Sequence, residues 1–472
     1  MMTGKESTEE KGNHLMLIAA IVLAGFLSLY NSVAMNVAIP TFVRVFDTDL
    51  DMVQWIMISY TLMMGVLSPT AGYFSDKFSC RNLFTASMLG FGLVALISGF
   101  CTNIYVMIAI RFLQGALAAF IVPCSMIIIY QFTPFRQRSK FLTLQTVSMS
   151  MGPAVGPVIS GVLLTHVSWQ SVFWINVPIA LFAAFAIFKA VPFEKSDSKE
   201  KLDYLGFIYV IFGTMLFLFS FNQASSYGFA SPVFWGLLAV GSVLIALFVR
   251  RCLKSADPIL NFRVLNNKDF SISLLVNSCI SMALCLVPFV LAIYFQDIKG
   301  YSPFFSGVIL LIPAVFSISG GPIAQYLYSR IDSKKIILAA MFFLSFGSIM
   351  LSGTTLESTL FFVIFWLCFR YLGIGLSSMP ITDYGMSSVS RELSGHGSSL
   401  INWFKMMSTS LSLSIFTMVL SMRTAIYAKS MDLLEAQMQA IDDVFLYSAF
   451  ILMFCLGTSF LLKSNKNLEK RG

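Results

Sequence analysis

Long uncharged apolar runs, separated by short polar segments, make up most of the chain. Residues 52–75, 82–110, 112–135 and 270–296 contain no charged side chain, and 141–188 is an uncharged stretch of about double length. A helix that crosses the hydrocarbon core of a bilayer needs about 20 consecutive apolar residues. The pattern therefore predicts an all-α polytopic membrane protein.

Charges and polar breaks divide these runs into fourteen predicted transmembrane helices. The double-length stretch divides at 168–171, and the run at 204–249 divides at 222–231. The predicted spans are 15–38, 53–74, 82–101, 104–128, 141–165, 171–189, 204–221, 232–249, 270–296, 303–328, 336–355, 358–382, 397–421 and 444–462.

The basic residues lie mostly on one side of this arrangement. With the N-terminus in the cytoplasm, the outer loops contain only Arg44, Lys299, Arg423 and Lys429 of the 31 Lys and Arg residues. Cytoplasmic loops of membrane proteins carry such an excess of Lys and Arg. The bias predicts that both termini are cytoplasmic, and it accounts for the net charge of +8 without a nucleic-acid partner.

The chain also repeats itself. Residues 69–81 and 322–334 share Pro, Ala and Tyr and two basic positions at one spacing, and each segment joins an inward span to an outward span. Parallel halves of this kind are common in transporters. The repeat predicts the following parts: a cytoplasmic tail at 1–14, a six-helix bundle at 15–189, a linker at 190–203, two inserted helices at 204–249, a linker at 250–269, a second six-helix bundle at 270–462 and a tail at 463–472.

Segment 422–443 is the longest predicted outer loop. Met431, Leu434, Met438 and Ile441 recur in it at helical spacing. The pattern favours a short amphipathic helix on the membrane surface or a solvated loop.

Composition narrows the function. The 472 residues are 57% hydrophobic and only 11% charged, and the eight Cys form no Cys-x-x-Cys pair. We expect no metal and no cofactor, and the absence of a phosphate-binding Gly-rich loop predicts no ATP site. The three His lie far apart along the chain, so we expect a transporter that is not an enzyme, with a membrane enzyme or receptor on the same scaffold as the alternative.

Three ionisable side chains lie inside predicted spans, namely Arg111, Arg370 and Lys405. Burying a charge in hydrocarbon is costly, so each is a candidate for function. Gln114 shares a helix face with Arg111 at the i+3 position. The alternative is that hydrogen bonds of these groups only lock the bundle.

Two further motifs are candidates for conformational change. The fifth span contains Gly152, Pro153, Gly156, Pro157 and Gly161, which predict a bent helix in close contact with a neighbour, either a moving interface or a static seam.

In the loop after the second span, Asp76 lies at the membrane face, close in sequence to the basic residues Lys77 and Arg81. Asp76 pairs with these cations or with a helix end, or it is a solvated loop charge.

These motifs together resemble the major facilitator superfamily, in particular its fourteen-spanner drug:proton antiporter branch. The loop at 72–81 is similar to the superfamily signature G-x-L-a-D-R-x-G-R-R, although Ser79 and Cys80 replace its usual Gly and Arg. Residues 111–115 resemble R-x-x-Q-G, and 152–161 resemble the antiporter G-P-x-x-G-P-x-x-x-G. Residues 169–178 are similar to W-R-W-x-F-x-I-N-V-P.

The resemblance implies the major facilitator fold, with two six-helix bundles and two extra central helices. It implies that the loop around Asp76 stabilises one conformation, that Arg111 takes part in proton relay or charge balance, and that the Gly-Pro helix is a hinge and seal. Asp297 and Arg370 are further candidates for coupling.

One departure from the branch changes the expected mechanism. Branch members usually carry Asp in the first span where this chain has Asn31. Asn does not titrate, whereas a buried carboxyl can carry a proton. The alternatives to proton antiport are therefore a differently coupled transporter and an uncoupled facilitator. The lack of a buried negative charge indicates neutral or anionic substrates.

We expect a monomer in the cell membrane that exports small amphipathic molecules, with protons as the counter-ion. Its substrate cavity should be lined by polar and aromatic residues of both bundles, although each could instead serve helix packing. These are Asn31, Trp55, Tyr60, Arg111, Gln114, Asn277, Gln296, Asn402 and Lys405.

Overall fold

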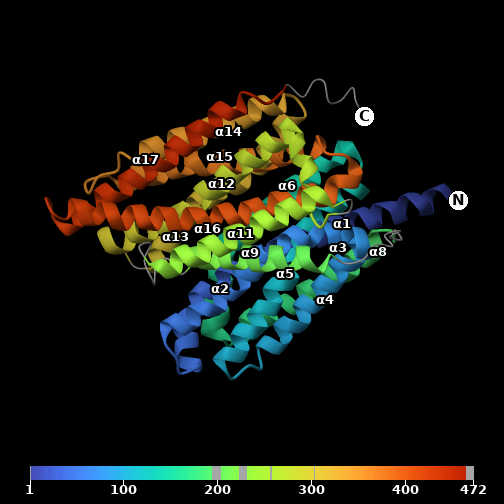
Figure 1. The fold of residues 1–472 in the computed structure, drawn as a ribbon, viewed down its shortest axis with the longest axis horizontal. Coiled ribbons are helices and arrows are strands. Elements are labelled where there is room, and N and C mark those ends of the chain that lie inside the picture. The colour runs from blue at the N-terminus through green and yellow to red at the C-terminus, as the bar shows by residue number, and fades with distance from the viewer. Residues whose placement is uncertain (1, 194–202, 223–230, 256–257, 302, 464–472) are drawn as a thin grey trace. The chain divides into compact units, whose positions relative to one another are not determined.

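The computed structural model describes residues 2–193, 203–222, 231–255, 258–301 and 303–463. In these ranges every regular element is a helix (Figure 1). The long helices are α1 (Met2–Val45), α2 (Leu50–Leu67), α4 (Cys80–Ser98), α5 (Ile104–Phe132), α6 (Phe135–His166), α8 (Asn176–Ala190), α9 (Tyr204–Asn222), α11 (Pro232–Lys254), α12 (Lys268–Ile293), α13 (Pro303–Tyr328), α14 (Ser333–Leu351), α15 (Leu360–Ser387), α16 (Ser394–Tyr427) and α17 (Leu433–Ser459).

Each predicted span coincides with one of these helices or with consecutive helical segments. The second span continues from α2 through the turn Ser68–Thr70 into α3 (Ala71–Phe78), and the sixth begins with the short α7 (Ser171–Trp174). Among the described residues, 12 helices are long and apolar enough to cross a membrane, and the bent α6 raises the number to 13. α12 covers the remaining predicted span, so the helices are compatible with fourteen crossings.

α6 bends by 43° between its segments Phe135–Gly156 and Val158–His166. The bend lies at position 157, where the sequence has proline. A proline inside a helix removes one backbone donor and clashes with the preceding turn, so a kink at this position is expected.

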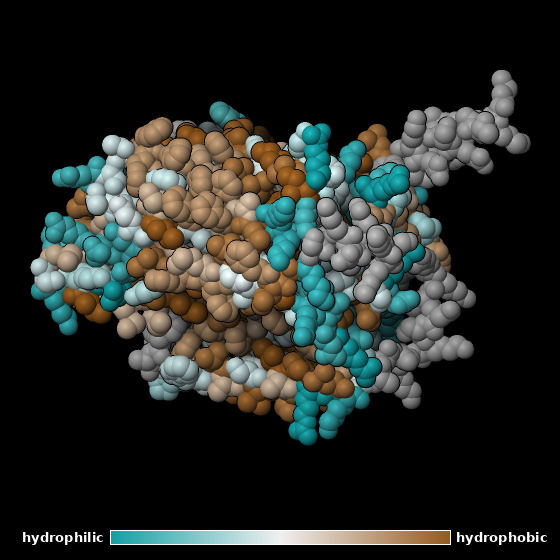
Figure 2. Space-filling model, turned by 90° about the horizontal axis from the view of Figure 1, so that it is seen from above, coloured by the Kyte–Doolittle hydropathy of each residue, from teal (hydrophilic) through white to brown (hydrophobic). Residues whose placement is uncertain are grey.

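Many large apolar side chains point outward. They include Leu89 and Leu93 of α4, Phe185 of α8, and Val240 and Val243 of α11. Figure 2 shows apolar side chains over much of the visible surface, with hydrophilic ones gathered in separate areas. A water-soluble protein rarely exposes so much contiguous apolar surface, whereas lipid chains accept it.

The chain folds as two compact units. Unit 1 comprises Met1–Phe219, Leu238–Val264 and Ser390–Trp403, and unit 2 comprises Ser220–Leu237, Leu265–Val389 and Phe404–Gly472. In unit 1, α5 packs on α2 and α4, and α8 packs on α4 and α1. In unit 2, α15 packs on α13 and α14, and α17 packs on α14 and α12. The helices of the two units therefore pack in the same order, as two halves related by the sequence repeat would.

Glycine permits a close contact between two helix backbones in each unit. A Cβ added at Gly115 of α5 would lie 2.2 Å from the carbonyl oxygen of Tyr60 on α2. A Cβ added at Gly375 of α15 would lie 2.1 Å from the carbonyl oxygen of Ser317 on α13. Because no side chain fits at these distances, glycine allows the two backbones to touch.

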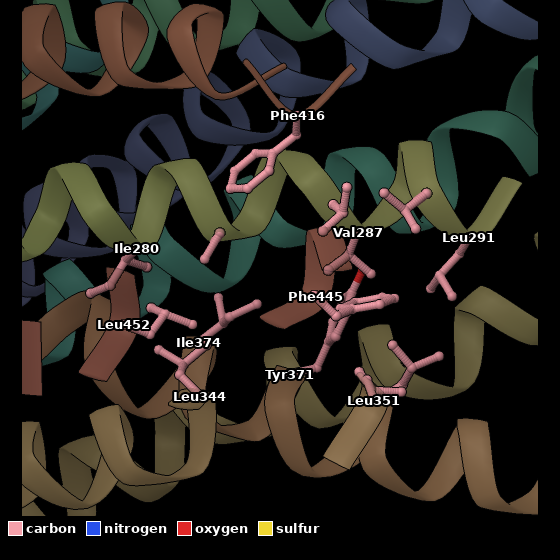
Figure 3. Packing of buried hydrophobic residues seen from close by; sticks show 14 of the residues in the cluster. Ile280, Val287, Leu291, Leu344, Leu351, Tyr371, Ile374, Phe416, Phe445 and Leu452 are labelled. Atoms are coloured by element: carbon pink, nitrogen blue, oxygen red, sulfur yellow. The ribbon is translucent and has the colours of Figure 1, made fainter. Parts of the chain in front are cut away.

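The core of unit 2 is a large cluster of buried aliphatic and aromatic side chains. Figure 3 shows Val287, Tyr371 and Phe445 gathered at one level of the helices, and Leu344 and Leu452 at another. These residues come from α12, α14, α15 and α17, so one continuous core joins the four helices.

The expected surface helix at 422–443 is wrong for the described residues. α16 continues to Tyr427 and α17 already begins at Leu433, so the segment consists of two long helix ends and a short turn. The helical spacing of its apolar residues has another cause: Met438 and Ile441 are buried in the core of unit 2.

Candidate functional site

Arg111 of α5 is fully buried in unit 1, with 0% of its surface exposed. Its Nε donates to the carbonyl oxygen of Ile56 on α2 at 3.0 Å, and its Nη2 donates to the carbonyl oxygen of Asn31 on α1 at 3.3 Å. Its Nη1 donates to Gln114 Oε1 at 2.5 Å, and its guanidinium lies 4.2 Å from the ring centre of Tyr60. One cation therefore connects three helices through carbonyl, amide and aromatic partners.

The neighbours of Arg111 form a continuous polar network. The Tyr60 hydroxyl donates to the carbonyl oxygen of Ser28 at 3.1 Å. The Asn31 amide donates to Asn176 Oδ1 of α8 at 2.8 Å. Among the described residues, Asn31 Oδ1 and Gln114 Nε2 are buried without a hydrogen-bond partner. Buried polar atoms without a partner are costly and few in native proteins, so each calls for a physical explanation.

Four sequence-predicted residues thus meet in unit 1: Asn31, Tyr60, Arg111 and Gln114. The sequence did not single out Asn176 as a site residue, although it belongs to the motif at 169–178. Trp55 is arranged differently, because its ring packs on Phe219 of α9 at a centroid distance of 5.7 Å.

In unit 2, Arg370 of α15 resembles Arg111 in its setting. It is also 0% exposed, its Nη2 donates to the carbonyl oxygen of Ala283 on α12 at 2.8 Å, and its Nε donates to Ser348 Oγ on α14 at 2.8 Å. Each unit therefore contains a buried arginine that donates to a backbone carbonyl of a neighbouring helix, α1 in unit 1 and α12 in unit 2. Arg370 Nη1 is buried without a hydrogen-bond partner among the described residues.

The other predicted lining residues are not part of these networks. The Thr382 hydroxyl donates to Asn277 Oδ1 at 3.4 Å in unit 2. Asn402 donates to the Ser398 carbonyl oxygen at 2.9 Å in unit 1. Gln296 lies in the π-helical turn Tyr294–Ile298, and Lys405 is half-buried on α16. A cavity shared by all the predicted lining residues stays a prediction.

α6 approaches α1 closely at the Gly-Pro motif. A Cβ added at Gly152 would lie 2.7 Å from the backbone nitrogen of Tyr30, whereas one at Gly156 would meet its first neighbour at 3.5 Å. Nothing lies within 4 Å of such an atom at Gly161. The first glycine of the motif is therefore in tight contact with α1, whereas the last has no neighbour at its Cβ position. The side chains of Pro153 and Pro157 lie outside the described residues.

The loop motif contacts the first turns of α16 within unit 1. The Gly72 N–H donates to Ser399 Oγ at 2.7 Å, and a Cβ at Gly72 would lie 2.7 Å from the Gly395 backbone. Asp76 Oδ2 lies 3.7 Å from His396 Nε2. His396 Nδ1 accepts from the N–H of Asn261 at 3.4 Å, which places the imidazole proton on Nε2, facing Asp76.

His396, Gly395 and Ser399 were therefore missed as partners of the loop. The only sequence signal was a run of small residues at 394–399 where a span begins. The two cations of the loop have aromatic neighbours: Lys77 Nζ lies 5.8 Å from the Tyr73 ring centre, and the Arg81 guanidinium 4.1 Å from that of Phe188.

These features define a multi-pass helical membrane protein with two similarly packed bundles and a buried arginine in each. The model of the Major Facilitator Superfamily matches residues 21–413, and the chain belongs to this family.

Individual relatives are distant. The chain is 29% identical to the "Uncharacterized MFS-type transporter YhcA" of Bacillus subtilis (strain 168) over 430 residues, which cover 90% of this chain and 80% of that one. It is 23% identical to the "Putative multidrug resistance protein MdtD" of Salmonella heidelberg (strain SL476), with 88% of each chain covered.

Solved structures share the fold. The human organic anion transporter MFSD10 (TETRAN) superposes with a TM-score of 0.62 at 13% identity, covering 93% of this chain and 99% of that one. The proton:xylose symporter XylE superposes with a TM-score of 0.63 at 13% identity, covering 96% of each chain.

Proposed function

We propose that this transporter exports small amphipathic molecules from the cytoplasm by alternating access, in exchange for protons. It acts as a monomer in the cell membrane with both termini in the cytoplasm. The name of the MdtD relatives supports drug-like substrates, and the basic residues of the predicted inner loops support this orientation.

The observation that carries the proposal is the buried network around Arg111. The contacts of the guanidinium described above are to carbonyl, amide and aromatic groups, with no carboxylate among them. A permanent cation inside a spanning helix is costly, so its retention is a functional signal. A positive charge that no anion neutralises favours neutral or anionic substrates over cationic ones.

The test is transport by the purified chain in proteoliposomes. An imposed pH gradient should drive a probe such as chloramphenicol against its own gradient, and dissipating the pH gradient should stop net accumulation. If exchange of the probe proceeds but ignores the pH gradient, antiport is wrong and transport stands. Cells that carry the gene should survive some compounds better than cells without it. If the proteoliposomes exchange none of these compounds, the proposal is contradicted.

An uncoupled facilitator is the second candidate, and Asn31 favours it. Its amide is held by Asn176 Oδ1 at 2.8 Å and the Leu27 carbonyl oxygen at 3.3 Å, a site with no titratable group at position 31. A facilitator would equilibrate the probe at any pH gradient, so the same proteoliposomes separate the two candidates.

We expect Asn31→Asp to extend the substrate range to cations. A carboxylate at this position would lie beside Arg111 and could offset its charge, since the two residues already share a hydrogen bond through the backbone. The tolerated concentration of ethidium should rise by roughly tenfold, the effect of about 1.4 kcal/mol. Asn31→Ala removes the amide without adding charge and is the control; an equal gain in both variants would contradict the charge argument.

We expect Gly72→Ala to separate the loop from the start of α16. The new methyl group would meet the Gly395 backbone at 2.7 Å, so the contact must open. Transport should fall about fivefold, the effect of about 1 kcal/mol of overpacking. A cysteine at buried Ser398 should at the same time react faster with a membrane-impermeant maleimide. Gly236→Ala is the control, because nothing lies within 4 Å of its added atom; unchanged labelling in Gly72→Ala would contradict the role of this contact.

A further inference from the structure

Two adjacent carboxylates, Asp442 and Asp443, lie well inside α17. The helix begins at Leu433, so Asp442 lies about 14 Å along it at 1.5 Å per residue. The flanking residues Ile441 and Val444 are 1% and 0% exposed and belong to the core of unit 2. The sequence placed both carboxylates in an outer loop; the structure places them in a helix that is long and apolar enough to cross a membrane.

The two carboxylates differ in their partners. Asp443 Oδ2 accepts from Arg423 Nε at 2.5 Å and from the Tyr427 hydroxyl at 2.9 Å, so its negative charge is balanced. Asp442 Oδ1 is buried and has no hydrogen-bond partner among the described residues. An ionised carboxylate oxygen is expensive to bury unpaired, and protonation removes that cost.

α17 packs on α12 and on the π-helical turn Tyr294–Ile298. Tyr294 is 2% exposed, its hydroxyl has no partner among the described residues, and it lies close enough to Asp442 and Tyr301 to interact electrostatically. π-helical turns occur frequently at functional sites because the extra residue redirects side chains. A buried carboxylate oxygen, Asp442 Oδ1, and a buried hydroxyl, neither with a hydrogen-bond partner among the described residues, therefore lie close enough to interact.

The charged groups around this pair are engaged elsewhere. Lys299 lies 5.7 Å from the Tyr294 ring centre, but its Nζ donates to the carbonyl oxygens of Leu356 at 2.6 Å and Ser358 at 3.2 Å. Arg423 of α16 is bound to Asp443, and Tyr447 lies near Arg423.

α14, which also packs on α17, carries its charged side chains Lys334 and Lys335 in its first turn. The side chain of Asp297 lies outside the described residues. Of the described groups, Asp443 is the carboxylate nearest in sequence, and its charge is balanced by Arg423.

We propose that Asp442 is the group that binds and releases the coupling proton of this transporter, in place of the first-span carboxylate that the chain lacks. The inference rests on the proposed proton-coupled function. One O–H bond forms at Asp442 when a proton arrives from the outer solution, which changes the side chain from anion to neutral acid, and the same bond breaks when the proton leaves. As a neutral acid, Asp442 no longer presents a negative charge to the buried Tyr294 hydroxyl, and this change would link proton binding to the position of α12 and its π-helical turn.

The test uses the full chain in proteoliposomes, with the neutral compound chloramphenicol as the probe. The Asp442→Asn variant should still exchange the probe when the pH is equal on both sides. Its accumulation of the probe under a pH gradient should fall by about tenfold or more. Asp442→Glu should restore the driven accumulation. Asp443→Asn is the matched neighbour; it should lower thermal stability, because Arg423 and Tyr427 lose their acceptor, and keep the response to the pH gradient.

Each failure has a distinct signature. Driven accumulation that survives in Asp442→Asn would overturn the inference and leave the proposed function intact. A wild-type chain that exchanges the probe without regard to pH would overturn both the inference and the antiport part of the proposed function, while transport would stand. If the probe is not exchanged at all, the proposed function fails for that probe. Infrared titration of the purified protein then decides for Asp442: a titrating carboxyl band that disappears in Asp442→Asn supports the proton site, and an unchanged spectrum overturns it.

Discussion

Replacing Arg111 with methionine should reduce transport by about a hundredfold, equivalent to about 2.7 kcal/mol. The substitution keeps most of the buried volume and removes the donors to the carbonyl oxygens of Asn31 and Ile56 and to Gln114. Each buried acceptor left without a partner costs about 1–3 kcal/mol. The measurement is probe exchange in proteoliposomes, normalised to the amount of folded protein in size-exclusion chromatography.

Two controls separate charge from geometry. Arg111→Lys keeps the charge but presents one compact ammonium where a planar fork makes hydrogen bonds in three directions, so it should recover little transport. Arg370→Met removes the related arginine of unit 2, which has a carbonyl and a hydroxyl as partners. If Arg111→Met folds and transports at the wild-type rate, the network only locks the bundle, and the claim that it carries the function is wrong.

The second large effect is expected for Gly152→Val. Even a single added carbon atom at this position would lie 2.7 Å from the Tyr30 backbone nitrogen and 3.1 Å from the Leu29 carbonyl carbon. Because both contacts are with backbone, α6 must move away from α1. Overpacking of this kind costs about 1–3 kcal/mol, and we expect a lower thermal midpoint together with about tenfold slower transport.

The same motif supplies matched controls. Gly161→Val should leave stability and transport unchanged, because nothing lies within 4 Å of the added atom. Gly156→Ala should have a small effect, because its nearest neighbour is a Tyr30 ring carbon at 3.5 Å. Equal losses at positions 152 and 161 would indicate that helix flexibility, and not the contact with α1, is what the glycines provide.

The two effects have a common physical origin. In lipid there is little hydrophobic drive for helices to associate, so close backbone contact and hydrogen bonds between helices hold the bundle together. Gly115 lets α5 touch α2, and the Arg111 guanidinium joins the same two helices to α1 about one turn away. Substitutions at these positions should therefore reduce transport or stability more than substitutions of neighbouring apolar residues do.

Much of the architecture was predictable from the sequence alone. A segment that crosses hydrocarbon must form an uncharged apolar helix of sufficient length. Because this requirement applies to each span separately, spans can be predicted from the sequence one segment at a time. The predicted spans accordingly match helices from α1 to α17, and the repeat at 69–81 and 322–334 matches the equivalent packing of the two units. Arg111 and Gln114 could be paired in advance because their i+3 spacing lies within a single helix.

What the sequence could not provide are partners that depend on how helices rotate against one another. The pairing of Asp76 with His396 and of Asn31 with Asn176 joins residues far apart in the chain, and that of Arg370 with Ser348 joins two different helices. The sequence predicts a loop at Asp442 and Asp443 because charged residues mark the ends of the predicted spans. Only the tertiary structure shows that neighbouring helices accommodate them, since a charge inside a membrane protein is tolerated where packing supplies its environment, and packing is not a property of any one segment.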